Sequence, residues 1–110
     1  MGLDQHNKID IVSLDKSGGT VVLSMVETRP WGQHGELLPD LQAKLNTYLS
    51  YTLDGQLPKD YPDVAHKRVT FRLHFAYVPG PQEELFLQLL RERYLEPNRI
   101  GWEQGLLPGQ

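Results

Sequence analysis

The side chains that could perform acid–base or metal chemistry are scattered along this 110-residue chain. Its four histidines are the first candidates for a general base or a metal ligand, and they fall at His6, His34, His66 and His74. No two of them have the spacing that places a pair of ligands on one helix or strand. The chain has no cysteine, which excludes disulfides, thiolate metal sites and a cysteine nucleophile.

The nearest approach to a metal site is a group of Asp60, Asp63 and His66 in a proline-containing segment. Two carboxylates and an imidazole could together bind a divalent cation. The alternative is a solvated acidic loop, which is favoured because nothing else in the sequence supports a metal centre. We therefore predict neither a metal nor a cofactor.

Aromatic residues around the first expected helix offer a different kind of site. Trp31 and His34 precede this helix, and Tyr48 and Tyr51 lie along it. A pocket lined by these side chains would indicate a ligand-binding domain or a small enzyme. The alternative is that Trp31 closes the open end of the core, because tryptophan is highly buried on average. Sequence motifs of phosphate-binding loops, dinucleotide-binding turns, zinc proteases and serine hydrolases are absent, so we predict no catalytic residue.

A third candidate surface is the polar face of a long strand, where Arg72 and His74 follow Lys67 and Arg68. Such a face could contact RNA, but RNA-binding sheets direct aromatic rings outward to stack on bases. The aromatic residues of this strand alternate onto the opposite, core-directed face, and they are Phe71, Phe75 and Tyr77. The formal net charge of −3 also disfavours nucleic-acid binding.

The elements that position these residues are predicted from periodicity. Residues 9–26 form a β-hairpin, because two β-branched segments flank a turn that ends in Gly18 and Gly19. A helix begins near residues 36–38, since Pro39 is tolerated only in a first turn, and it ends at Asp54 and Gly55. Its apolar side chains recur every three or four residues.

The second half of the chain continues with a loop at 56–67 and an alternating strand at 69–78. A second helix starts at Pro81 and stops at Pro97, and a short last strand covers 99–103. The order β-β-α-β-α-β predicts a single α+β domain over residues 1–110, with a small mixed sheet and two helices packed on one face. If the second and third strands are neighbours, they run parallel. Residues 1–7 and 105–110 are predicted to be loose termini.

No apolar run is long enough to span a bilayer, and the first residues lack the basic and apolar regions of a signal peptide. We therefore predict a cytoplasmic protein that does not contact a membrane.

The pattern Leu41-Gln42-x-Lys44-x-Asn46-x-Tyr48, within the stretch from Trp31 to Tyr48, resembles a family of small bacterial domains of unknown function. The resemblance extends back to Ile9-Asp10-Ile11-Val12-Ser13 and forward to Phe75-Ala76-Tyr77-Val78-Pro79. It implies a bacterial, cytoplasmic, stand-alone domain and no particular activity.

The sequence is compatible with three functions. The leading hypothesis is a non-enzymatic module that binds a protein partner or a second copy of itself. It is supported by the missing catalytic motifs and by an outer strand face that mixes Arg72 and His74 with Ala76 and Val78. The alternatives are a ligand-binding domain or enzyme with a pocket near Trp31, His34 and Tyr48, and an RNA-binding protein.

Overall fold

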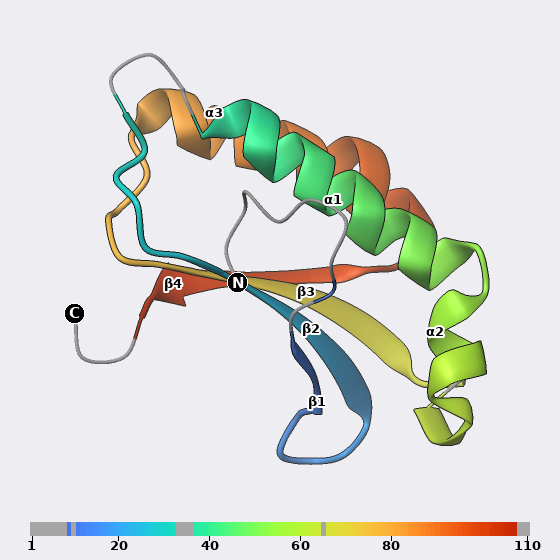
Figure 1. Cartoon of the computed structure of the whole chain (residues 1–110). Coiled ribbons are helices and arrows are strands. Elements are labelled where there is room, and N and C mark those ends of the chain that lie inside the picture. Colours follow the sequence, from blue (N-terminus) through green and yellow to red (C-terminus); the bar gives the residue numbers. More distant parts are fainter. Residues whose placement is uncertain (1–8, 10, 33–36, 65, 108–110) are drawn as a thin grey trace.

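A four-stranded mixed sheet with helices on one face forms the protein, as the α+β prediction required (Figure 1). The computed structural model describes residues 9, 11–32, 37–64 and 66–107. The strands lie side by side in chain order and are β1 (Ile11–Leu14), β2 (Thr20–Glu27), β3 (Arg68–Phe75) and β4 (Gly101–Leu106). The helices that cover the sheet are α1 (Leu38–Leu53) and α3 (Pro81–Leu90).

The predicted hairpin is confirmed, since β1 pairs antiparallel with β2. Its turn is held by the Asp15 carboxylate, whose Oδ1 accepts hydrogen bonds from the backbone N–H groups of Gly19 and Thr20 at 3.0 and 3.3 Å. Gly18 has a φ of 74°, a conformation that a residue without Cβ adopts at no steric cost.

The conditional prediction of parallel pairing is also confirmed. β2 pairs parallel with β3, and β3 pairs parallel with β4. Parallel neighbours need a crossover connection, and α1 and α3 provide the two crossovers on the same face of the sheet (Figure 1). The opposite face of the sheet carries no helix within the described part of the chain.

The first helix begins at Leu38, within the predicted range, with Pro39 in its first turn. It buries Leu41, Leu45 and Tyr48 against the sheet. Gly55 follows the end of α1 with a φ of 91°, as the sequence predicted for this glycine.

The prediction of a plain loop over 56–67 was wrong. Gly55 turns the chain into a short helix, α2 (Gln56–Asp60), and a 3-10 turn follows at Pro62–Val64. Leu57 of this helix is buried in the core and fixes the segment against it. The two prolines of the segment are the reason that the sequence predicts irregular structure here.

The prediction that Tyr77 belongs to the core-directed face of β3 was wrong as well. β3 ends at Phe75, and the Tyr77 side chain is 52% exposed. The neighbouring β2 ends at Glu27, so the pairing stops where the backbone N–H of Ala76 donates to the Glu27 carbonyl. Trp31 fills the core beside Phe75, where its ring makes an edge-on contact.

The C-terminal half differs from prediction in its boundaries. The axis of α3 continues through a π-helical turn (Arg91–Leu95) and a 3-10 turn (Glu96–Asn98), so Pro97 lies inside the last turn. β4 covers 101–106 instead of 99–103, and Gly105 and Leu106 therefore belong to the sheet and not to a loose tail. Leu107 extends this pairing by donating its N–H to the Phe75 carbonyl.

One apolar core lies between the helices and the sheet. It combines residues of β2 and β3 with the inner faces of α1 and α3 and with Leu95 and Ile100 from the last crossover. None of the described helices has the length and apolar character that crossing a membrane requires.

Candidate functional site

Trp31, the first aromatic candidate, lies in the core. Its indole N–H donates to the Tyr77 carbonyl at 2.7 Å, and its ring packs edge-on against Phe75 at a centroid distance of 6.1 Å. A buried tryptophan needs a partner for its single donor, and the backbone beyond β3 supplies that partner.

Tyr48 is also a core side chain. Its hydroxyl donates to the Ser24 carbonyl at 2.8 Å, and its ring meets Phe71 edge-on at 5.6 Å. The predicted pocket of Trp31, His34 and Tyr48 thus has two members buried among core residues. His34 lies outside the described residues.

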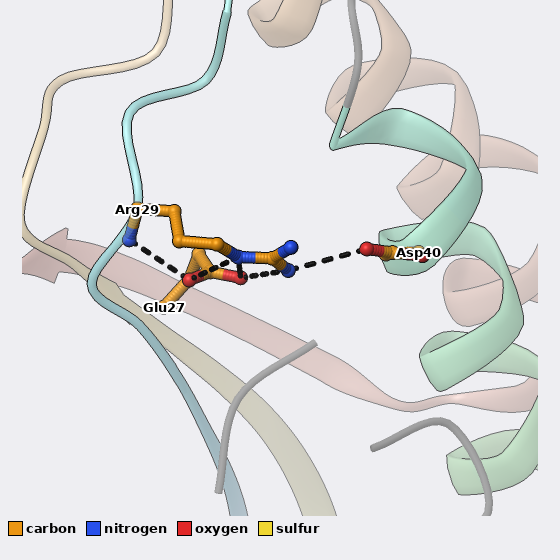
Figure 2. A network of polar contacts seen from close by, with 3 residues as sticks. All are labelled: Glu27, Arg29 and Asp40. Atoms are coloured by element: carbon orange, nitrogen blue, oxygen red, sulfur yellow. Dashed lines mark hydrogen bonds and ion pairs between the residues drawn. The ribbon is translucent and has the colours of Figure 1, made fainter. Parts of the chain in front are cut away.

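A network of polar contacts holds the end of β2 against the start of α1 (Figure 2). The buried Glu27 carboxylate accepts hydrogen bonds from Arg29 Nε at 3.0 and 3.1 Å, from Nη2 at 2.6 Å and from the backbone N–H at 2.9 Å. Arg29 Nη2 also donates to Asp40 Oδ2 at 3.2 Å. The hydrogen bond to Glu27, assisted by the negative charges of Glu27 and Asp40, raises the pKa of the Arg29 guanidinium above its ordinary value.

This network is suited to a structural task. A general base needs a lone pair that is available to a substrate proton, whereas the Glu27 carboxylate oxygens already accept several charge-assisted bonds. Asp40 lies in the first turn of α1, where a negative charge also favours the helix dipole. The contacts therefore fasten the connection between β2 and α1.

Arg72 and His74 point away from the helices, because they alternate with Phe71, Leu73 and Phe75 along β3. Arg72 forms an ion pair with Glu103 of β4 at 2.9 Å, so its charge is compensated on this face. The predicted outer face that combines these residues with Ala76 and Val78 does not form, since both of the latter lie beyond the end of β3.

The three side chains that were weighed as metal ligands, Asp60, Asp63 and His66, are all exposed. Asp60 accepts hydrogen bonds from the Tyr51 hydroxyl at 2.9 Å and from Gln56 Nε2 at 2.7 Å. Desolvation and the hydrogen bond to Asp60 raise the pKa of Tyr51 to about 12. The described residues include no group of three or more histidine, aspartate or glutamate side chains placed to hold a metal ion.

The hollow that the structure does form here is a groove of about 490 Å³ between β1 and the segment of α2 and the 3-10 turn. We call it the β1 groove. Its apolar wall consists of Val12 and Leu14 from one side and Tyr61 and Val64 from the other, and its acidic rim consists of Asp60 and Asp63. Leu14 is 50% exposed and Tyr61 is 44% exposed, so apolar surface faces solvent on both sides of the groove.

The strand beside this groove has an open edge. β1 is the first strand of the sheet, and within the described residues only β2 pairs with it. Ile11–Leu14 contains no lysine and no proline, the residues that commonly protect an exposed edge from pairing with another chain. Within the described part of the chain, the outer backbone edge of β1 therefore has no strand beside it.

Sequence reasoning missed the β1 groove for a definite reason. The sequence predicts a loop around Tyr61 and a hairpin strand around Val12 and Leu14, and neither prediction relates the two segments to each other. An aromatic residue followed by proline between two aspartates was the available signal. Only the tertiary fold brings Tyr61 opposite β1, because about fifty residues of chain separate the two.

The comparisons with known proteins agree with the resemblance noted in the sequence. No curated protein and no solved structure matches the chain. A family model described as a family of unknown function, DUF6572, matches residues 1–102, which includes every helix and the start of β4. The chain therefore belongs to this family of unknown function.

Proposed function

We propose that this protein is a non-enzymatic interaction module that binds an extended segment of a partner protein along β1. The observation that carries the proposal is the open edge of β1 next to the apolar β1 groove. The predicted bacterial origin and cytoplasmic location belong to the same proposal.

An extended segment suits this site because strand addition uses two sources of affinity. Backbone N–H and C=O groups along the edge of β1 supply hydrogen bonds, and alternate side chains of the added strand occupy pockets. Val12 and Leu14 pair with Leu23 and Val21 and share their face of the sheet, and both line the β1 groove. Alternate side chains of the partner would lie over the same groove.

The charge of the rim favours a basic partner. The Asp63 side chain forms no hydrogen bond or ion pair with the described residues, and Asp60 is held in place by Tyr51 and Gln56. A lysine or arginine of the partner would meet both carboxylates. A second copy of this chain would instead bring two acidic rims together, so the favoured occupant is a different protein with alternating apolar and basic residues.

Selection from a library of displayed random peptides tests the proposal. We expect the selected peptides to alternate apolar residues with lysine or arginine. Fluorescence anisotropy should then show that Leu14→Lys weakens the binding of a selected peptide by about tenfold or more, because the substitution removes apolar surface and places a cation at the site. Leu85→Lys on α3 is the matched control, since Leu85 is 57% exposed and lies outside the β1 groove.

Two results would contradict the proposal. One is equal binding of the selected peptides to the wild type and to Leu14→Lys, and the other is a library that yields no binding peptide. Light scattering tests the other possible occupant of β1, a second copy of this chain. A dimer that dissociates upon Leu14→Lys would show that β1 pairs with that second copy and not with a different protein.

A further inference from the structure

A second hollow, of about 380 Å³, lies where the three parallel strands begin. Thr20 starts β2, Arg68 starts β3 and Gly101 starts β4, and all three line it. Thr70 and Arg99 complete its polar lining. We call it the strand-start pocket. It is separate from the β1 groove, with which it shares no lining residue.

The two arginines of this pocket differ from the other arginines discussed above. Arg29 and Arg72 are paired with carboxylates, at Glu27 and Glu103. The guanidinium groups of Arg68 and Arg99 form neither a hydrogen bond nor an ion pair anywhere in the described part of the chain. Five N–H donors on each of them therefore remain available for a ligand.

The backbone at Arg99 adds an independent observation. Arg99 has a φ of 58° and a ψ of 34°, and among the described residues it is the only non-glycine residue with a positive φ. It follows the last helical turn, where glycine is the usual residue because it has no Cβ to strain. An arginine at this position costs stability, which indicates a task for its side chain.

Gly101 lines the pocket without a side chain, which leaves the space beside Thr70 open. A Cβ at this position would lie 2.7 Å from Thr70 Oγ1, closer than real contacts allow, so a larger residue would displace the threonine. Neither the Thr20 hydroxyl nor the Thr70 hydroxyl forms a hydrogen bond with another described residue. Two hydroxyl donors thus accompany the two guanidinium groups.

We propose that the strand-start pocket binds a small phosphomonoester, whose phosphate lies between Arg68 and Arg99 and accepts hydrogen bonds from the Thr20 and Thr70 hydroxyls. The planar fork of arginine matches the geometry of a phosphate group, and bonds between ionised groups are the strongest hydrogen bonds available. The volume falls within the range of small-molecule sites. A polynucleotide fits less well, because the Arg72–Glu103 pair interrupts the basic strip along β3 and the net charge is −3.

Isothermal titration calorimetry with adenosine 5′-monophosphate and with inorganic phosphate tests this site, and adenosine serves as the probe without phosphate. We expect saturable binding of the first two at one site per chain and none of adenosine. Arg68→Gln and Arg99→Gly should each weaken binding by about tenfold or more, since each removes charged hydrogen bonds. Arg99→Gly should also unfold at the same or a higher temperature than the wild type, because glycine relieves the strained φ.

Arg93→Gln is the matched control, since it removes one positive charge at a residue that does not line the pocket. An equal loss of affinity in this control would show diffuse attraction of anions and overturn the proposal. Unchanged binding in Arg99→Gly would overturn it too. So would tighter, strongly salt-dependent binding of a single-stranded RNA with no binding of the monophosphate. Leu14→Lys should leave phosphate binding intact, so this site and the β1 groove can fail independently.

Discussion

At the scale of single residues, the polar atoms of aromatic side chains decide which candidates belong to the core. Trp31 and Tyr48 are buried because the Tyr77 and Ser24 carbonyls accept their hydrogen bonds. A buried donor without a partner would be costly, so the carbonyl determines whether such a residue can lie inside. The sequence left both residues as candidates for a site, whereas carbonyls from β2 and from the segment after β3, both distant along the chain, make them core residues.

The raised pKa of Tyr51 predicts how the stability of the fold changes at high pH. This pKa is raised to about 12, chiefly by desolvation and then by the hydrogen bond to Asp60. The folded state therefore retains the phenolic proton longer than the unfolded state, whose tyrosines titrate near pH 10. This stabilising contribution is complete below about pH 10 and is lost as the pH rises through about 12.

Nuclear magnetic resonance of ring-labelled tyrosine should give Tyr51 a titration midpoint near 12. Tyr51→Phe should make the free energy of unfolding depend less on pH between about 10 and 12. Asp60→Asn is the companion variant, and it should lower the midpoint of Tyr51 because it removes the charged acceptor. A midpoint for Tyr51 near 10 in the folded wild type would contradict the burial and the hydrogen bond described here.

At the scale of elements, the apolar stripe of α1 supplies much of the contact between the helices and the sheet. Leu45 is 2% exposed in the core, whereas Leu53 at the end of the same helix is 50% exposed. Leu45→Ala should lower the free energy of unfolding by about 2–5 kcal/mol through lost burial and a residual cavity. Leu53→Ala should change it by less than about 1 kcal/mol. Urea denaturation measures both, and similar losses in the two variants would show that the stripe is not what binds α1.

The elements with strong periodicity were predicted well, and those without it were not. The hairpin, α1 and the alternating core of β3 follow from repeats of two or of three to four residues. The end of β3 does not, because Tyr77 continues the alternation although β2 has no residue left to pair with it. The helix α2 was not predicted because Pro58 and Pro62 indicate a loop, whereas burial of Leu57 in the core stabilises the helix.

At the scale of the whole molecule, one core joins β2, β3, α1 and α3, so the chain should unfold as a single unit. Calorimetry should show one transition whose calorimetric and van't Hoff enthalpies agree, at about 80 kcal/mol near 60 °C for a chain of this length. Two transitions, or a van't Hoff enthalpy well below the calorimetric one, would divide the chain into separate folding units.

The sequence by itself determined the α+β class, the hairpin, the helix faces and the absence of a recognised catalytic motif, because these follow from local spacing and composition. Only the tertiary structure decided where function is best sought. The β1 groove joins β1 to a segment about fifty residues away, and the strand-start pocket joins residues from the starts of three strands. Spacing along the chain does not report such contacts, since they arise when crossover helices bring distant strands together.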